Sequence, residues 1–101
     1  MTRALVGKAA DLQPGMSVRV VLDGVPVAVF NVDGQFHAIA DTCSHEEASL
    51  SEGFVEEDIV ECPKHGAMFH IPTGEVRSLP ATHGVTTYPT VVDGDDLYVE
   101  A

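Results

Sequence analysis

The sequence predicts an all-β protein, a sandwich or open barrel of antiparallel strands that carries a smaller inserted β-subdomain. Two observations predict this class: short apolar segments alternate or run together through most of the chain, and Asp-Gly pairs separate several of them. Evidence for helix is thin, since only "ASLSEG" (48–53) is compatible with a single turn. At 101 residues the chain has the size of one domain.

The N-terminal half predicts three consecutive strands. They cover "SVRVVL" (17–22), "VPVAVFNV" (25–32) and "QFHAIA" (35–40), and Asp23-Gly24 and Asp33-Gly34 separate them. Asp-Gly between apolar runs is a strong hairpin signal because the tight turn needs residues with positive φ.

The rest of the chain predicts shorter strands and a terminal hairpin. "VTTYPTVV" (85–92) and "DLYVE" (96–100) flank a turn, and Pro89 restricts part of the first segment to a sheet edge. Between them and the N-terminal strands, "DIVEC" (58–62), "AMFHI" (67–71) and "EVRS" (75–78) predict short strands, with a tight turn at Thr73-Gly74. We therefore expect one domain over 1–101, with a subdomain over about 41–79 inserted in a basal domain of 1–40 and 80–101.

Charge and composition exclude several classes of function. Five basic and sixteen acidic residues give a net charge of −11, which a nucleic-acid backbone repels. No apolar run approaches the length of a membrane span, and the N-terminus lacks a signal-peptide core, so we expect a cytoplasmic protein. In that compartment two cysteines indicate metal or redox chemistry rather than a disulfide. The segment 41–65 holds eight acids and one base, or −7 of the total charge.

Each cysteine lies beside a histidine in turn-like sequence. The pairs are Cys43-x-His45 and Cys62-x-x-His65, with sixteen residues between them. Unrelated thiols and histidines are one interpretation, and a structural two-Cys, two-His zinc site is another, although zinc sites usually pair Cys with Cys. In a Rieske centre one iron binds two thiolates and the other binds two imidazoles. If two loops hold the cluster from opposite sides, each loop supplies one cysteine and one histidine.

The motif "CSH…CPKHG" resembles the Rieske signature C-x-H…C-x-x-H. The stretch "SHEEASLSEGFVEEDIVECPKHGAMFHIPTGEV" and the ending "YPTVVDGDDLYVE" are similar to the small Rieske ferredoxins of bacterial aromatic-ring-hydroxylating dioxygenase systems. The resemblance implies a Rieske fold and a 2Fe–2S cluster. It implies that Cys43 and Cys62 bind one iron and that His45 and His65 bind the outer one, where electrons leave.

The resemblance also implies a function. The chain is expected to be a soluble one-electron carrier rather than an enzyme, passing electrons from a NAD(P)H-dependent ferredoxin reductase to a terminal oxygenase. As a monomer it would bind both partners transiently. Its acidic side chains either steer basic docking surfaces or serve only to keep the protein soluble. The alternatives are a Rieske subunit of a larger, nitrite-reductase-type enzyme, a redox- or metal-responsive binding module, and a structural zinc module.

Further residues follow from comparison within that family. High-potential respiratory members carry an extra cysteine in each loop, where this chain has Ala48 and Lys64, and a serine and a tyrosine where it has Ala67 and Phe69. Fewer hydrogen-bond donors predict a reduction potential near the low end of the Rieske range, about −150 mV. Pro80 in "SLPAT" is the candidate for a loop that shields the cluster. The remaining histidines are expected to be strand or loop residues: His37, His70 and His83.

Overall fold

The computed structural model describes residues 2–42, 48–64, 66–79 and 83–101. These residues form eleven strands in three antiparallel sheets, with two three-residue 3-10 helices and no α-helix among them. The all-β prediction is confirmed, and so is the single turn within "ASLSEG", which is η2 (Leu50–Glu52). Neither 3-10 helix of the described chain has the length or hydropathy to cross a membrane.

The central sheet has the order β2-β3-β4-β9. Its strands are β2 (Ser17–Leu22), β3 (Val25–Val32), β4 (Gln35–Ala40) and β9 (Thr87–Tyr88), and the first three match the predicted ranges. Asp23 and Asp33 both have φ of 52° and each precedes a glycine with positive φ, as the Asp-Gly turns require. The turns and the β3–β4 pairing, from Val27↔Ala40 to Val32↔Gln35, fix the register of this sheet.

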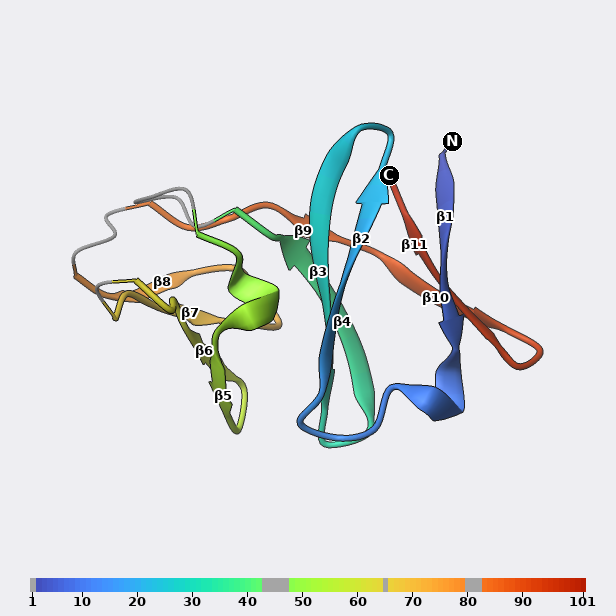
Figure 1. The fold of residues 1–101 in the computed structure, drawn as a ribbon, viewed down its shortest axis with the longest axis horizontal. Coiled ribbons are helices and arrows are strands. Elements are labelled where there is room, and N and C mark those ends of the chain that lie inside the picture. Colours follow the sequence, from blue (N-terminus) through green and yellow to red (C-terminus); the bar gives the residue numbers. More distant parts are fainter. Residues whose placement is uncertain (1, 43–47, 65, 80–82) are drawn as a thin grey trace.

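Strand β3 is buried on both faces, which explains its almost continuous apolar sequence. Val27 and Val29 belong to one hydrophobic core, and Ala28 and Phe30 to another. The first core is closed by Leu97 and Val99 of the sheet β1-β11-β10, and the second by residues of the sheet β5-β6-β7-β8. The central sheet therefore lies between the other two, as the ribbon shows (Figure 1).

The small sheet consists of four strands of three residues each: β5 (Phe54–Glu56), β6 (Ile59–Glu61), β7 (Met68–His70) and β8 (Val76–Ser78). Val55, Val60 and Phe69 are paired across it, and all three pack into the core shared with β3. The predicted Thr73-Gly74 turn is present, since the Gly74 N–H donates to the His70 carbonyl at 2.7 Å and Gly74 has φ of 74°. The division of the chain into a basal domain and an inserted subdomain stays a prediction.

The third sheet joins the two ends of the chain. β1 (Arg3–Lys8) pairs with β11 (Asp96–Glu100), and β11 pairs with β10 (Thr90–Asp93) in the predicted terminal hairpin. Pro89 separates β9 from β10, so the chain leaves the edge of the central sheet and continues at the edge of the third. The strands on either side of Pro89 are edge strands, as predicted, but the segment expected as one strand over 85–92 is divided: β9 pairs with β4, and only β10 pairs with β11. η1 (Ala9–Asp11) follows β1. The sequence patterns did not predict β1 or β5.

Candidate functional site

Cys62 lies at the start of a short connection between β6 and β7. Glu61 pairs with Met68 at the end of the ladder, and the Cys62 N–H donates to the Ala67 carbonyl at 2.7 Å. Gly66 has φ of 74°, a conformation in which glycine costs least, and this allows the chain to reverse within the loop. The Cys62 residue is only 1% exposed and belongs to the core of Val60 and Phe69.

The other three predicted ligands, Cys43, His45 and His65, lie outside the described residues. So does Pro80. The described part of the chain holds no group of three or more Cys, His, Asp or Glu side chains that could bind a metal ion. What the structure does show is how both ends of the first predicted ligand segment are held.

Asp41 joins the two ends of that segment. Its carboxylate accepts hydrogen bonds from the Ser49 hydroxyl and, at 2.8 Å, from the Ser51 N–H. Its backbone carbonyl accepts from the Leu50 N–H at 2.7 Å, and Thr42 and Ser49 form an isolated antiparallel bridge. Residues 41–42 and 49–51 are thereby fixed side by side, although residues 43–48 separate them along the chain.

The same carboxylate connects the segment to the central sheet. Arg19 of β2 places its Nε 3.3 Å from the Asp41 Oδ2, and the Asp41 N–H donates to the Pro26 carbonyl of β3. Ser17 of β2 donates its hydroxyl to the Ser51 carbonyl at 2.7 Å. We call Asp41, Ser49, Ser51 and Arg19 the Asp41 clamp. The Asp41 side chain is 3% exposed, so it does not add to the acidic surface that the sequence analysis counted it in.

The two predicted ligand segments have different anchors. The Asp41 clamp ties the first to β2 and β3, whereas Cys62 begins a loop within the small sheet. Leu50, next to the clamp, is fully buried in the same core as Cys62 and Phe69, so apolar packing connects the two anchors. This arrangement has no simple sequence signal, because the partners of Asp41 come from three parts of the chain.

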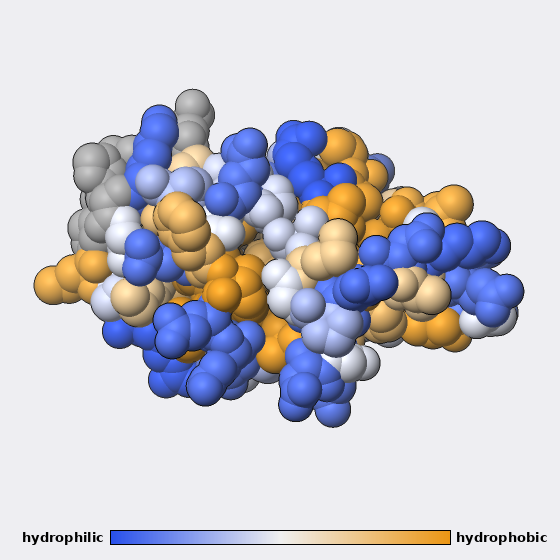
Figure 2. Space-filling view, turned by 60° about the horizontal axis from the view of Figure 1, so that its bottom comes forward, coloured by the Kyte–Doolittle hydropathy of each residue, from blue (hydrophilic) through white to orange (hydrophobic). Residues whose placement is uncertain are grey.

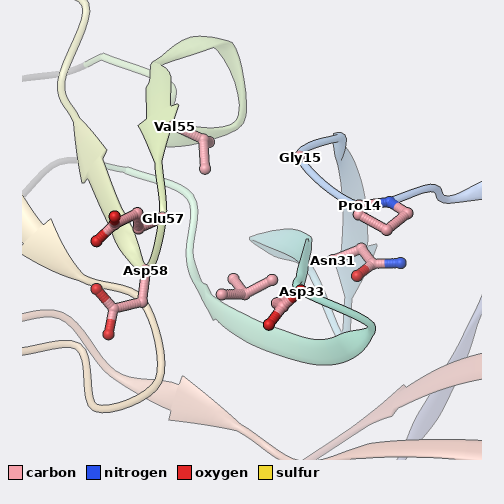
Figure 3. Close-up of a pocket in the computed structure, with 8 residues that line it drawn as sticks. Pro14, Gly15, Asn31, Asp33, Val55, Glu57 and Asp58 are labelled. Carbon is pink, nitrogen blue, oxygen red and sulfur yellow. The ribbon is translucent and has the colours of Figure 1, made fainter.

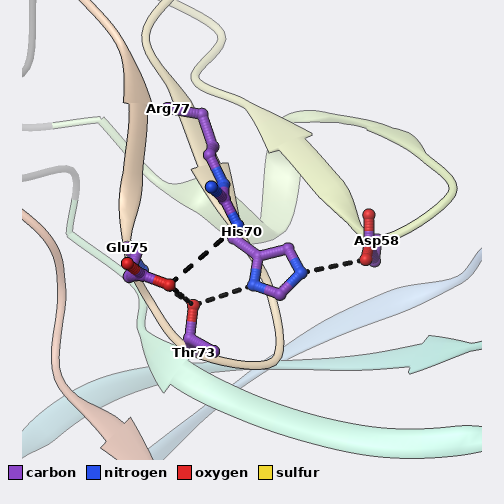
Figure 4. A network of polar contacts seen from close by, with 5 residues as sticks. All are labelled: Asp58, His70, Thr73, Glu75 and Arg77. Atoms are coloured by element: carbon purple, nitrogen blue, oxygen red, sulfur yellow. Dashed lines mark hydrogen bonds and ion pairs between the residues drawn. The ribbon is translucent and has the colours of Figure 1, made fainter.

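His70 is a structural histidine, as predicted. Its Nε2 lies 2.9 Å from the Asp58 Oδ2 and its Nδ1 2.8 Å from the Thr73 hydroxyl, which itself donates to Glu75 (Figure 4). These contacts join the β5–β6 turn to the β7–β8 turn. His37 lies in β4, where burial first and the charge of His70 second lower its pKa. His83 is exposed in the segment between β8 and β9.

A separate hollow lies between the central and small sheets, with a volume of about 590 Å³ (Figure 3). Pro14, Gly15 and the β3–β4 turn residue Asp33 line one side, and Glu57 and Asp58 of the β5–β6 turn line the other. Cys62, the predicted ligand that the structure describes, is not among the described residues that line this hollow.

The fold and the site define a small β-protein with a buried thiol between two short strands and a second, clamped loop. The Rieske [2Fe-2S] domain family matches residues 2–89 of this chain. The 3-phenylpropionate/cinnamic acid dioxygenase ferredoxin subunit of Escherichia coli (strain K12) is 46% identical over 99% of this chain and 94% of its own length.

Solved structures give the same result. A chain in the complex of reduced oxygenase and oxidized ferredoxin in carbazole 1,9a-dioxygenase superposes with a TM-score of 0.91 at 41% identity, covering 96% of this chain and 100% of that one. The ferredoxin of carbazole 1,9a-dioxygenase from Nocardioides aromaticivorans IC177 superposes with a TM-score of 0.92 at 34% identity, covering 98% and 97%. The chain therefore belongs to the Rieske [2Fe-2S] domain family, and its cofactor is a Rieske-type 2Fe–2S cluster.

The described part of the site fits this cofactor. A cysteine thiolate is the ligand that iron–sulfur clusters use, and Cys62 is withdrawn from water among apolar side chains. Gly66, with φ of 74°, lies in the turn-like sequence that follows Cys62. The predicted Rieske family and cofactor are confirmed, while the assignment of all four ligands stays a prediction.

Proposed function

We propose that this protein is the soluble ferredoxin component of an aromatic-ring dioxygenase system. It carries single electrons from a NAD(P)H-dependent ferredoxin reductase to a terminal oxygenase and catalyses no reaction of its own. The observation that carries the proposal is the 46% identity to a dioxygenase ferredoxin subunit over nearly the full length of both chains. One structural relative is, by its title, a complex of oxygenase and ferredoxin.

We further propose Cys43 and Cys62 as ligands of one iron and His45 and His65 as ligands of the other. When bound, the cluster would supply a centre that takes up and gives away a single electron. Support for the ligand set comes from the spacing of the four residues and from the buried Cys62 at the expected place in its loop. Two cysteines used in this way agree with a cytoplasmic location.

The surroundings of Cys62 favour a low reduction potential. Ala67 and Phe69 are fully buried beside it in the same core, and neither side chain has a hydrogen-bond donor. Since hydrogen bonds to cluster sulfurs stabilise the reduced, more negative state, two side chains that cannot donate at these positions favour a lower potential. A low potential suits a carrier that receives electrons from a flavin reductase.

The proposal is tested by reconstitution. The holoprotein is mixed with NADH, a ferredoxin reductase and the oxygenase of a dioxygenase system that uses a related ferredoxin, and hydroxylated product is measured with and without it. We expect product only in its presence, and a monomer by light scattering. A loaded holoprotein that supports no turnover with any such pair, or that purifies bound within a larger reductase, contradicts the proposal.

A further inference from the structure

The small sheet has one face in the core and one face in solvent, and the outward face combines apolar and acidic side chains. The pairing Phe54↔Glu61↔Met68 forms one row across β5, β6 and β7. The pairing Glu56↔Ile59↔His70 forms the next outward row, because the intervening row of Val55, Val60 and Phe69 points into the core. We call the outward side chains the Phe54 face: Phe54, Glu56, Ile59, Glu61 and Met68.

The Phe54 face exposes two large apolar side chains around a hollow. Phe54 is 68% exposed and Met68 37%, and a hollow of about 320 Å³ opens between Phe54, Ile59 and Met68. Single exposed apolar residues are common, but aromatic and methionine side chains gathered around a hollow are typical of protein–protein interfaces. Figure 2 shows hydrophobic surface between strongly hydrophilic groups over the part of the molecule that holds β5–β8.

Acidic side chains surround this apolar centre. Glu56, Glu57 and Glu61 line the hollow, and no lysine or arginine is among its lining residues. A matching surface therefore has an apolar centre with lysine or arginine around it. A second copy of this chain does not match, because two such faces would bring glutamates against glutamates.

Two residues of the Phe54 face flank the Cys62 loop directly along the chain. Glu61 and Met68, the last pair of the β6–β7 ladder, are the residues at which the Cys62 loop begins and ends. A protein docked on the row of Phe54, Glu61 and Met68 is thus next to the loop that holds a cluster ligand.

We propose that the Phe54 face is a docking surface for a redox-partner protein whose own surface has an apolar centre ringed by lysine and arginine. This inference rests on the proposed function and names the surface through which it operates. The apolar centre lengthens the lifetime of the complex, and the glutamates accelerate its formation at low ionic strength.

The test uses holoprotein variants with matched controls. Phe54→Ser removes the apolar centre, and its control is Val92→Ser, which changes a 51%-exposed apolar residue of β10. The double variant Glu56→Gln/Glu61→Gln removes two charges of the face, and its control is Asp93→Asn/Asp95→Asn in the β10–β11 hairpin. An unchanged visible spectrum establishes that each variant holds its cluster.

Two half-reactions are measured at low and high salt: reduction of the ferredoxin by the reductase, and its oxidation by the oxygenase. In at least one of them we expect Phe54→Ser to raise KM about tenfold with kcat unchanged, as loss of an interface aromatic does. The double glutamate variant raises KM at low salt and flattens the salt dependence, whereas both controls behave as wild type.

KM values for Phe54→Ser within twofold of wild type in both half-reactions overturn the docking surface and leave the carrier function standing. Equal effects of the β10–β11 controls also overturn it, since they reduce the effect to net charge. A loaded wild-type protein that neither binds nor exchanges electrons with either partner overturns the proposed function and this surface together.

Discussion

Replacing His65 by cysteine exchanges a neutral nitrogen donor for an anionic thiolate. If His65 is a ligand, the added negative charge opposes reduction, and the potential falls by roughly 100 mV or the cluster is lost. Redox titration of His65→Cys followed by EPR checks this, with His37→Gln as the control that leaves the potential unchanged. An unaltered potential and spectrum in His65→Cys removes that residue from the ligand set.

Asp41→Asn tests whether the Asp41 clamp positions the first ligand segment. The amide keeps the size of the side chain but loses the negative charge that pairs with Arg19 and strengthens the hydrogen bonds from Ser49 and Ser51. We expect iron release to a chelator to accelerate several-fold and the free energy of unfolding to fall by about 1–3 kcal/mol.

The matched control for Asp41→Asn is Asp58→Asn. Asp58 lies in the β5–β6 turn, and the change weakens its contact to His70 of β7. It should lower the melting temperature without accelerating iron release. If Asp41→Asn unfolds more easily but releases iron at the wild-type rate, Asp41 stabilises the fold and does not position the ligand segment.

We expect His37 to contribute to the pH dependence of the free energy of unfolding. Burial and the charge of His70 lower its pKa in the folded protein, so the unfolded chain takes up a proton more readily. The contribution of neutral His37 to the free energy of unfolding is fully present above the ordinary histidine pKa. It is lost as the pH falls toward and through the lowered pKa of the folded protein. Urea unfolding should show the stability of wild type relative to His37→Gln shrinking from pH 7.5 to pH 5.5; an equal difference at both pH values contradicts this.

At the scale of elements, two glycines with similar φ separate backbone strain from steric fit. Gly24 and Gly74 have φ of 81° and 74°, but a Cβ on Gly24 meets no atom within 4 Å, whereas one on Gly74 collides with the Val85 carbonyl oxygen. Gly24→Ala should cost about 1 kcal/mol and Gly74→Ala about 3 kcal/mol, measured by denaturant unfolding. Equal costs would show that the β7–β8 turn shifts freely away from Val85.

Elements held by local rules could be predicted from the sequence. β2, β3 and β4 match the expected ranges because Asp-Gly turns and apolar runs define them within a few residues. β1 pairs with β11 at the far end of the chain and contains a register shift between Leu5 and Gly7, so no local pattern marks it. β5 has three residues and begins with an exposed phenylalanine, contrary to the usual pattern for a strand end.

The candidate site also combines features that follow from a local sequence pattern with features that depend on tertiary structure. The Cys–His spacing is a local motif and predicts the cofactor without a structure. The Asp41 clamp depends on β2, β3 and η2 meeting in space, and the Phe54 face depends on the pairing of β5 with β6 and β7. Such arrangements come from tertiary structure and leave no recurring pattern in one sequence.

At the scale of the whole molecule, the central sheet separates two hydrophobic cores. One of its faces packs against the sheet that joins the chain ends, and the other packs against the small sheet that carries Cys62. The net charge of −11 favours weak, salt-sensitive complexes with basic partners. The small sheet thus carries Cys62 and, under the proposal above, the docking surface, while it also shares a hydrophobic core with the central sheet.

The most direct measurement is a redox titration of the native protein followed by EPR. We expect a rhombic Rieske signal after reduction by dithionite, with a midpoint potential of about −150 mV. EPR silence together with stoichiometric zinc would contradict the electron-carrier function, and a Rieske signal several hundred millivolts higher would contradict delivery of electrons from a flavin reductase to an oxygenase.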